Sequence, residues 1–198
     1  SSPPQEALVD ISATVDRATL LANQMLALAK VAQLSQQANT SVVDWAQVLR
    51  DVAIDLSPLV ADKDLDFDIH TQAAPVLAHE WMLRELCRNL LHNAIRHSPA
   101  GGQLRLSLTV DSAAATLVIH DDGPGISDAL RARLFQPFSS GQPQSGSGLG
   151  LAICQGIVQA LGGQIQLDNR PQNATASTSP AGLDAKVQLP LANLTPVT

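Results

Sequence analysis

The chain has 198 residues, enough for one sizeable domain with an appendage and a real hydrophobic core. Its formal net charge of −6 argues against a nucleic-acid-binding protein, but not against a nucleotide, because Mg²⁺ and backbone amides can neutralise a triphosphate locally. No apolar run approaches the roughly 20 residues of a membrane-spanning helix, and the composition of the first residues leads us to expect no signal peptide in this sequence. Cys87 and Cys154 lack metal-ligand spacing and fit small core residues in a reducing compartment.

The first part of the chain is predicted to be helical. Apolar residues recur at helical spacing over residues 6–37 without Gly or Pro, which predicts a helix roughly 45 Å long. A helix of that length normally pairs with another, so we expect it to self-associate or to pair with a helix outside this sequence. The polar segment 37–41 is the best domain boundary. A second helix is expected over residues 44–61, with Asp44 at its start.

The remaining elements alternate between strands and helices. Alternating hydrophobicity predicts the strands, and Gly or Pro marks where elements end. The expected order is a strand at 65–71, a short strand at 75–78, a helix at 79–98, an antiparallel hairpin at 103–111 and 115–121, a short helix at 127–135, a Gly/Ser-rich loop at 139–148, a helix at 149–161 and a final hairpin at 164–169 and 186–191.

The helix expected over residues 79–98 has an unusual polar face. Five polar side chains fall within about 120° of one another at 3.6 residues per turn; they are Glu85, Asn89, Asn93, Arg96 and His97. Two Asn at i and i+4 lower helix propensity, and a solvated face more often carries Lys and Glu. From these residues alone, a ligand site and a merely solvated face are both open.

Two glycine motifs follow this helix. Residues 121–125 read Asp-Asp-Gly-Pro-Gly at the end of a strand, where glycine lets the backbone pass close to a ligand and Asp can accept a hydrogen bond from an exocyclic amine. Residues 146–151 read Gly-Ser-Gly-Leu-Gly-Leu at the start of a helix, whose free N–H groups can bind phosphate. Each motif alone is also typical of an ordinary turn. The second lacks the preceding strand of a Rossmann fingerprint and the Gly-Lys-Ser/Thr of a P-loop.

The order of the motifs carries more information than any one of them. The Asn-bearing helix, the Asp-x-Gly-x-Gly segment, residues 135–138 (Phe-Gln-Pro-Phe) and the Gly-x-Gly-Leu-Gly-Leu segment follow one another. They resemble the N box, first glycine box, F box and second glycine box of the ATP-binding catalytic domain of sensor histidine kinases, over about residues 43–191. The resemblance implies an α+β fold, a two-layer α/β sandwich of the Bergerat type with a mixed sheet and helices on one face, preceded by one long helix.

The resemblance also divides the chain. Residues 1–40 resemble the second helix of the family's dimerisation and phosphoacceptor domain, and residues 41–198 would be the ATP-binding catalytic domain. None of the five histidines has the context of the family's phosphorylated His, so the acceptor is expected upstream of this sequence. By the same resemblance, the chain would form homodimers through the helical hairpin, pass phosphate to a cognate response regulator, and be the cytoplasmic portion of a bacterial sensor anchored in the inner membrane through upstream segments. No nucleic-acid partner is expected.

The family's site residues carry over onto matching positions. ATP and Mg²⁺ would be the ligands, with Asn93 on the metal, Asn89 beside it, Arg96 at the phosphates and His97 against the nucleotide. Asp121 would accept a hydrogen bond from the adenine amino group. The residues expected to let the chain pass the base or to cradle the phosphates are Gly123, Gly125, Gly146, Gly148, Leu149 and Gly150.

One position bears on the reaction. Related ATPases have a water-activating Glu where this chain has Asn89, and an amide cannot act as a general base. Transfer to another acceptor is therefore favoured over hydrolysis, and catalysis would be mostly positioning with neutralisation of phosphate charge. Glu85, one turn earlier, could orient an incoming imidazole.

The lid departs from the family pattern. Residues 138–148 contain no Lys or Arg, where many members place a basic residue against the phosphates, although Arg131 or Arg133 could substitute. The leading hypothesis is a protein-histidine kinase that transfers the γ-phosphoryl of Mg-ATP. The alternatives are a non-catalytic ATP-sensing or docking module of the same fold and a related ATPase.

Overall fold

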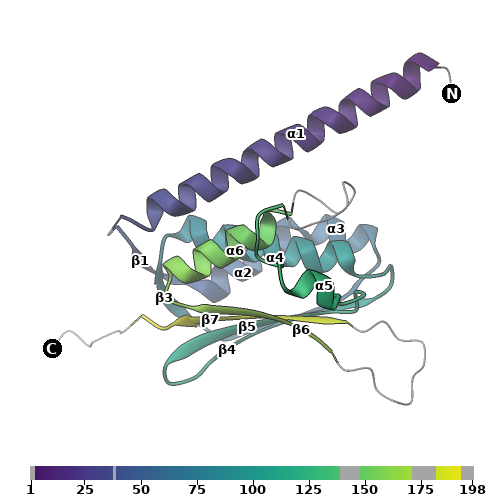
Figure 1. Cartoon of the computed structure of the whole chain (residues 1–198). Helices are drawn as coiled ribbons and strands as arrows, with labels where there is room; N and C mark the ends of the chain where they lie inside the picture. The colour runs from purple at the N-terminus through teal and green to yellow at the C-terminus, as the bar shows by residue number, and fades with distance from the viewer. Residues whose placement is uncertain (1–2, 38, 139–147, 171–181, 193–198) are drawn as a thin grey trace.

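A computed structural model of the chain describes residues 3–37, 39–138, 148–170 and 182–192. Within these residues, helices and strands follow the expected order with one additional strand and one additional helix (Figure 1). The helices are α1 (Pro3–Leu34), α2 (Trp45–Asp55), α3 (Ser57–Asp62), α4 (Glu80–His97), α5 (Asp128–Arg131) and α6 (Gly150–Ala160). The strands are β1 (Ser41–Asp44), β2 (Asp66–Thr71), β3 (Pro75–Ala78), β4 (Gln103–Val110), β5 (Ala114–Asp121), β6 (Gln164–Asn169) and β7 (Leu183–Pro190).

The main sheet has five strands in the order β2-β4-β5-β7-β6. The pair β2–β4 is parallel and the other pairs are antiparallel, so the sheet is mixed, as expected. Alternate residues of β4 and β5, such as Leu106 and Ile119, are fully buried, because successive side chains of a strand point to opposite faces. The sheet therefore buries one aliphatic face.

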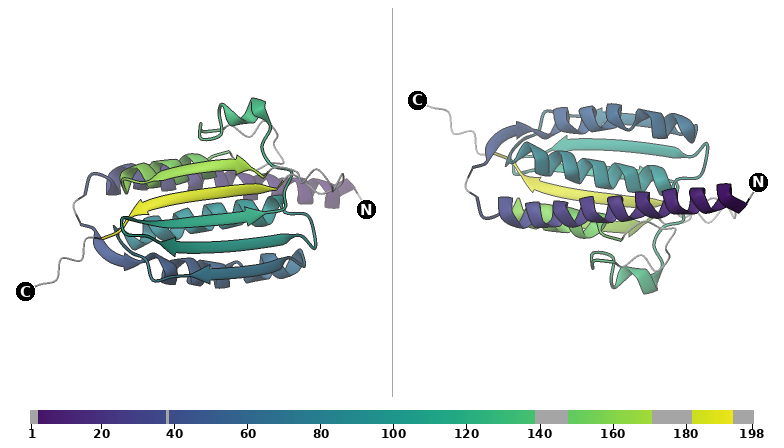
Figure 2. Two further views of the ribbon diagram at one scale, coloured as in Figure 1. Left: turned by 90° about the horizontal axis from the view of Figure 1, so that it is seen from below. Right: turned by 90° about the horizontal axis from the view of Figure 1, so that it is seen from above.

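Helices cover that buried face in a second layer. Figure 2 shows strands from one side of the molecule and helices α2, α4 and α6 from the other. Helix α4 lies in the middle and contacts both α2 and α6, and eight of its side chains are buried: Met82, Leu83, Leu86, Cys87, Leu90, Leu91, Ala94 and Ile95. The two-layer α/β arrangement is confirmed.

Two local predictions were wrong in detail. The single helix expected over residues 44–61 is two helices, because Pro58 lies in the first turn of α3 and cannot donate a hydrogen bond inside a longer helix. The polar segment 37–41, expected to be a domain boundary, continues into strand β1, and the antiparallel pairing of β1 with β3 is a tertiary contact that local sequence does not reveal. The cap at Asp44 is confirmed, since its carboxylate accepts a hydrogen bond from the Ala46 N–H over 3.2 Å.

Helix α1 lies along α6 on the outside of the helical layer (Figure 1). Ala27 and Val31 are buried at this contact, and the Lys30 ammonium lies 4.2 Å from the centre of the Trp81 ring. On its outer side α1 still exposes large apolar side chains, among them Val15 and Leu26. Within the described residues, no helix is long and apolar enough to cross a membrane.

Candidate nucleotide-binding site

A pocket opens between α4, the end of β5 and the sheet. Its volume, which includes space open to solvent, is about 640 Å³. Polar groups come from Asn93 and His97 on α4 and from Asp121 at the end of β5, with Gly125 beside them. The rest of the lining is mostly apolar: Leu90, Ala94, Pro124, Ile126, Leu130, Leu134, Leu151, Leu167, Leu183 and Ala185. Segments far apart in sequence thus meet at one mostly apolar cavity with a few convergent polar groups.

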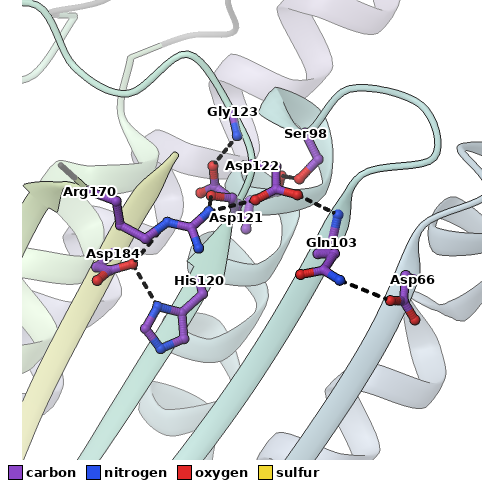
Figure 3. A network of polar contacts seen from close by, with 10 residues as sticks. Asp66, Ser98, Gln103, His120, Asp121, Asp122, Gly123, Arg170 and Asp184 are labelled. Carbon is purple, nitrogen blue, oxygen red and sulfur yellow. Dashed lines mark hydrogen bonds and ion pairs between the residues drawn. The ribbon is translucent and has the colours of Figure 1, made fainter. Parts of the chain in front are cut away.

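Asp121 is the buried acid of this pocket. Its residue surface is only 3% exposed, and its Oδ1 accepts a hydrogen bond from the Gly123 N–H over 2.8 Å (Figure 3). Burial raises the pKa of this carboxyl from 3.8 to about 6, while the Gly123 N–H and the Arg170 guanidinium act to lower it. A carboxylate with this pKa is ionised at neutral pH and can accept a hydrogen bond.

The glycines after Asp121 are needed for close packing against the protein itself. A Cβ at Gly123 would lie 2.7 Å from the Asp121 Oδ1 and 3.1 Å from the His97 carbonyl oxygen. Gly125 has a φ of +71°, which L side chains rarely adopt. Because neither glycine carries a side chain, the segment after β5 can pass close to Asp121 and to the backbone of His97.

The side chains of Asn89 and Asn93 on α4 lie next to the start of α6. The Asn89 Nδ2 donates to the Glu85 Oε1 and to the Glu85 carbonyl oxygen, each over 2.8 Å. A Cβ on Gly150 would lie 3.0 Å from the Asn89 Oδ1 and 4.0 Å from the Asn93 Nδ2. The first residue of α6 is thus packed against both asparagines, and a glycine there keeps that space open.

Comparison with known proteins identifies this arrangement. Residues 78–193 match the family described as histidine kinase-, DNA gyrase B-, and HSP90-like ATPase, which is more than half of the chain. The chain belongs to this family.

Its relatives are sensor kinases. The sensor protein kinase PmrB of Pseudomonas aeruginosa is 31% identical over 189 residues, covering 92% of this chain and 38% of that protein. The sensor protein QseC of Escherichia coli strain K12 is 29% identical over 187 residues, covering 92% of this chain and 39% of that protein. A solved structure of the mycobacterial sensor histidine kinase MprB is 31% identical with a TM-score of 0.66, covering 77% of this chain and 97% of that one. The chain spans about two-fifths of the length of these curated relatives and carries their type of ATP-binding catalytic domain.

The last turn of α4 is fixed by a lysine from another element. The Lys63 ammonium donates to the carbonyl oxygens of Arg96 and Ser98 over 2.6 and 2.8 Å, which suits the negative end of a helix dipole.

His97 lines the pocket, and its pKa is lowered by burial and then by the nearby cations Arg96, Lys63 and His92. It is therefore a neutral imidazole at neutral pH. Among the described residues, the pocket lining includes His97 but not the Arg96 side chain.

The remaining residues of the family's site lie at the start of α6. Gly148 has a φ of +70°, and Leu149 is 1% exposed and precedes the first residue of the helix. Gly146 lies outside the described residues. Arg131, one candidate for the missing basic residue of the lid, donates to the Leu167 carbonyl oxygen over 3.2 Å. In this conformation its guanidinium is held at strand β6.

Sequence reasoning missed two residues beside the pocket. Asn169 and Arg170, at the end of β6, make side-chain hydrogen bonds to the segment after β5. They read as ordinary polar residues that end a strand. The only signal was that β5 and β6 run in the same direction and end at the same edge of the sheet. That signal is indirect, because using it requires knowledge of the strand order.

Proposed function

We propose that this chain is the ATP-binding catalytic part of a protein-histidine kinase. It would transfer the γ-phosphoryl group of ATP to a histidine outside this sequence, from which the phosphate passes to an aspartate of a cognate response regulator. The observation that carries the proposal is the pocket in which Asn93 and His97 of α4 meet Asp121 and Gly125 from the end of β5. The membership of the family and the sensor kinases among the relatives support it.

The pocket fits an adenine base. Side chains such as Leu134 and Leu167 offer apolar walls, and Asp121 offers a buried carboxylate that is ionised at neutral pH. Adenine presents an amino donor where guanine presents an oxygen, so an acceptor at this position favours ATP over GTP. Gly123 and Gly125 would let the backbone pass the base, since a side chain at Gly123 already has no room.

The phosphate end would lie between α4 and the start of α6. We assign Asn93 to Mg²⁺, with Asn89 beside it, because amide oxygens are suitable ligands and Mg²⁺ usually takes one or two protein groups together with substrate phosphates. Within the described residues, no group of three or more His, Cys, Asp and Glu could hold a metal ion, and such a site does not require one. When bound, Mg²⁺ would neutralise phosphate charge while ATP supplies the γ-phosphoryl group. The phosphates are assigned to Arg96 and to the backbone of Gly146, Gly148, Leu149 and Gly150.

The chemistry assigned to α4 is positioning. The Asn89 amide is held by Glu85 and cannot remove a proton from water, which disfavours hydrolysis. The Glu85 side chain is 12% exposed and also lies 3.4 Å from the Arg88 guanidinium. Glu85 would therefore fix the Asn89 amide, and it is also our candidate for orienting the acceptor imidazole.

The domain division and the partners are part of the same proposal. Residues 1–40 would be the second helix of the dimerisation and phosphoacceptor domain, and residues 41–198 the ATP-binding catalytic domain. The exposed apolar side chains of α1, including Val15 and Leu26, support pairing with another helix, as in a homodimer. We propose that the chain is the cytoplasmic portion of a bacterial sensor that is attached to the inner membrane through upstream segments.

Calorimetry with Mg-ATP tests the site. Asn93→Ala and Asp121→Ala should each abolish measurable binding, while Gln47→Ala on the exposed side of α2 should bind as the unchanged protein does. Unchanged ATP affinity in both Asn93→Ala and Asp121→Ala would refute the proposed ATP site.

Labelling with γ-labelled ATP tests the reaction. The chain alone should take up no acid-labile label, and a separately added polypeptide containing the acceptor helix should become labelled on histidine. ATP binding without any transfer would favour the non-catalytic sensing module instead. Steady release of inorganic phosphate would favour a related ATPase.

A further inference from the structure

Three strand ends meet at the edge of the sheet beside the pocket. Strand β5 ends at Asp121 and β6 ends at Asn169, and both residues pair with Leu183 at the start of β7. Arg170, the residue that follows β6, therefore lies close to the chain that leaves β5 (Figure 3). After Asp121, residues 122–126 belong to no helix or strand, so they lack the hydrogen-bond ladder that would hold them in place.

Asn169 holds the far end of this segment. Its Oδ1 accepts from the Ile126 N–H and its Nδ2 donates to the Ile126 carbonyl oxygen, each over 2.7 Å. A Cβ on Gly125 would lie 2.7 Å from the same Asn169 Oδ1. Gly125 thus leaves room for the Asn169 amide, and the amide satisfies both backbone groups of the next residue.

Arg170 holds the near end. Its Nη2 donates to the Asp121 carbonyl oxygen over 2.7 Å and to the Asp122 Oδ1 over 2.6 Å (Figure 3). A Cβ on Gly182 would collide with the Arg170 guanidinium, and the Gly182 N–H donates to the Gly123 carbonyl oxygen over 2.8 Å. The segment is therefore held at its start, its middle and its end by residues from the β6–β7 side.

We propose that Asn169 and Arg170 form a clamp that positions the Asp121 carboxylate for recognition of the adenine amino group. The proposal rests on the ATP site proposed above and deepens it. Among the described residues, the pocket lining includes Asp121 and Gly125 but neither member of the clamp, so both act through the segment they hold. Hydrogen-bonding groups that recognise a ligand need a supporting set of contacts to keep their geometry, and this irregular segment obtains that support from the clamp.

The clamp also sets the charge around Asp121. The Arg170 guanidinium lies between Asp122 and Asp184, with its Nε 3.7 Å from the Asp184 Oδ1. The Asp184 Oδ1 is also 2.6 Å from the His120 Nδ1. Asp122 and Asp184 raise the pKa of Asp121 and Arg170 lowers it, so removal of the guanidinium raises this pKa further. Asn169 carries no charge, so replacing it should not shift the pKa of Asp121 through a charge effect, whereas replacing Arg170 should. The pH dependence of ATP binding therefore distinguishes the two members of the clamp.

In the part of the pocket lining that the structure describes, His97 of α4 is the other titratable group. The pKa of His97 is lowered by burial and by Arg96, Lys63 and His92, none of which belongs to the clamp, so we assign a difference between the pH profiles of the unchanged protein and the clamp variants to the clamp.

The test compares ATP with purine riboside triphosphate, which lacks the amino group, by calorimetry in Mg²⁺ between pH 5.5 and 8. The variants are Arg170→Met, Arg170→Lys and Asn169→Ala. The control is Arg50→Met, because Arg50 also makes two guanidinium hydrogen bonds, to Thr71 and Gln47, and Thr71 ends β2 at the opposite end of the sheet.

Arg170→Met should weaken ATP binding at pH 7.5 on the order of tenfold and should leave the affinity for the analogue within about twofold. As the pH is lowered, ATP affinity should begin to fall at a higher pH in Arg170→Met than in the unchanged protein. Arg170→Lys should return this pH to its value in the unchanged protein. Asn169→Ala should weaken ATP binding without moving the pH dependence. Arg50→Met should change neither quantity.

Unchanged ATP affinity in both Arg170→Met and Asn169→Ala would overturn the clamp. An equal loss for ATP and the analogue, with a lowered melting temperature and no change in pH dependence, would also overturn it in favour of a structural role alone. If Arg170→Met does not fold, Asn169→Ala and Arg170→Lys decide the outcome. Asp121→Ala separates the two proposals. If Asp121→Ala still binds ATP, the proposed site is wrong. If Asp121→Ala loses ATP binding but the clamp variants keep it, only the clamp is wrong.

Discussion

Replacing Asp121 by Asn is expected to stabilise the ligand-free protein while removing its preference for ATP. Asp121 is almost fully buried, and this burial is the largest of the effects that raise its pKa from 3.8 to about 6. Such a carboxylate is harder to ionise in the folded protein than in the unfolded chain. The neutral amide of Asn avoids this cost and can still accept the hydrogen bond from the Gly123 N–H.

The size and sign of the effect follow from the two pKa values. A pKa raised from 3.8 to about 6 corresponds to a cost of about 3 kcal/mol in folding free energy, at about 1.4 kcal/mol per pKa unit. Below about pH 4 the carboxyl is protonated in both states and the cost is absent. Between about pH 4 and 6 the unfolded chain ionises first, so the folded state loses stability, and above pH 6 the loss is complete. The advantage of Asp121→Asn should therefore grow from near zero at pH 4 to about 3 kcal/mol at pH 7.5.

Urea unfolding at several pH values between 4 and 8 measures this difference, provided that the denaturant slope is unchanged. Asp16→Asn on the exposed side of α1 is the control and should stay within about 0.5 kcal/mol of the unchanged protein at every pH. A difference between Asp121→Asn and the unchanged protein that does not vary with pH would refute the reasoning, as would a less stable variant at pH 7.5. Calorimetry on the same samples should show similar, weak affinities for ATP and GTP.

Three further predictions concern other parts of the fold. Gly150→Ala should lower ATP affinity on the order of tenfold with little change in melting temperature, because the new Cβ would lie 3.0 Å from the Asn89 Oδ1 and displace that amide. Neither cysteine should react with a thiol reagent at pH 8 until the protein is unfolded, since burial raises the pKa of Cys87 to about 12 and both thiols are buried. Val31→Asp should release the end of α1 from α6 and speed thermolysin cleavage between α1 and β1, whereas Leu26→Asp, at a residue that is 68% exposed, should not.

Much of the fold could be predicted because its signals are local. The alternation in β4 and β5 and the apolar stripe of α4 each depend on the period of a single element, and these elements lie where they were expected. The division of the second helix at Pro58 had a local signal that was missed. Strand β1 has only Val42 and Val43 as a local signal, and its pairing with β3 could not be read from so short a segment.

The candidate site divides in the same way. Asn93, His97 and Asp121 were singled out from residue types, spacing and resemblance, and the structure brings them to one pocket. The contributions of Asn169 and Arg170 could not be anticipated, because each depends on two strands ending at the same edge of the sheet.

The sequence by itself determined most of the elements, the family and the chemistry available at the pocket, since these depend on periodicity and on the order of motifs along the chain. Only the tertiary structure decided how the pocket acid is held. The distance from Asp121 to Arg170 along the chain carries no information about their contact, which arises because β7 lies between β5 and β6 and brings their ends together. Burial, which raises the pKa of Asp121, and the guanidinium, which lowers it, are both products of that packing.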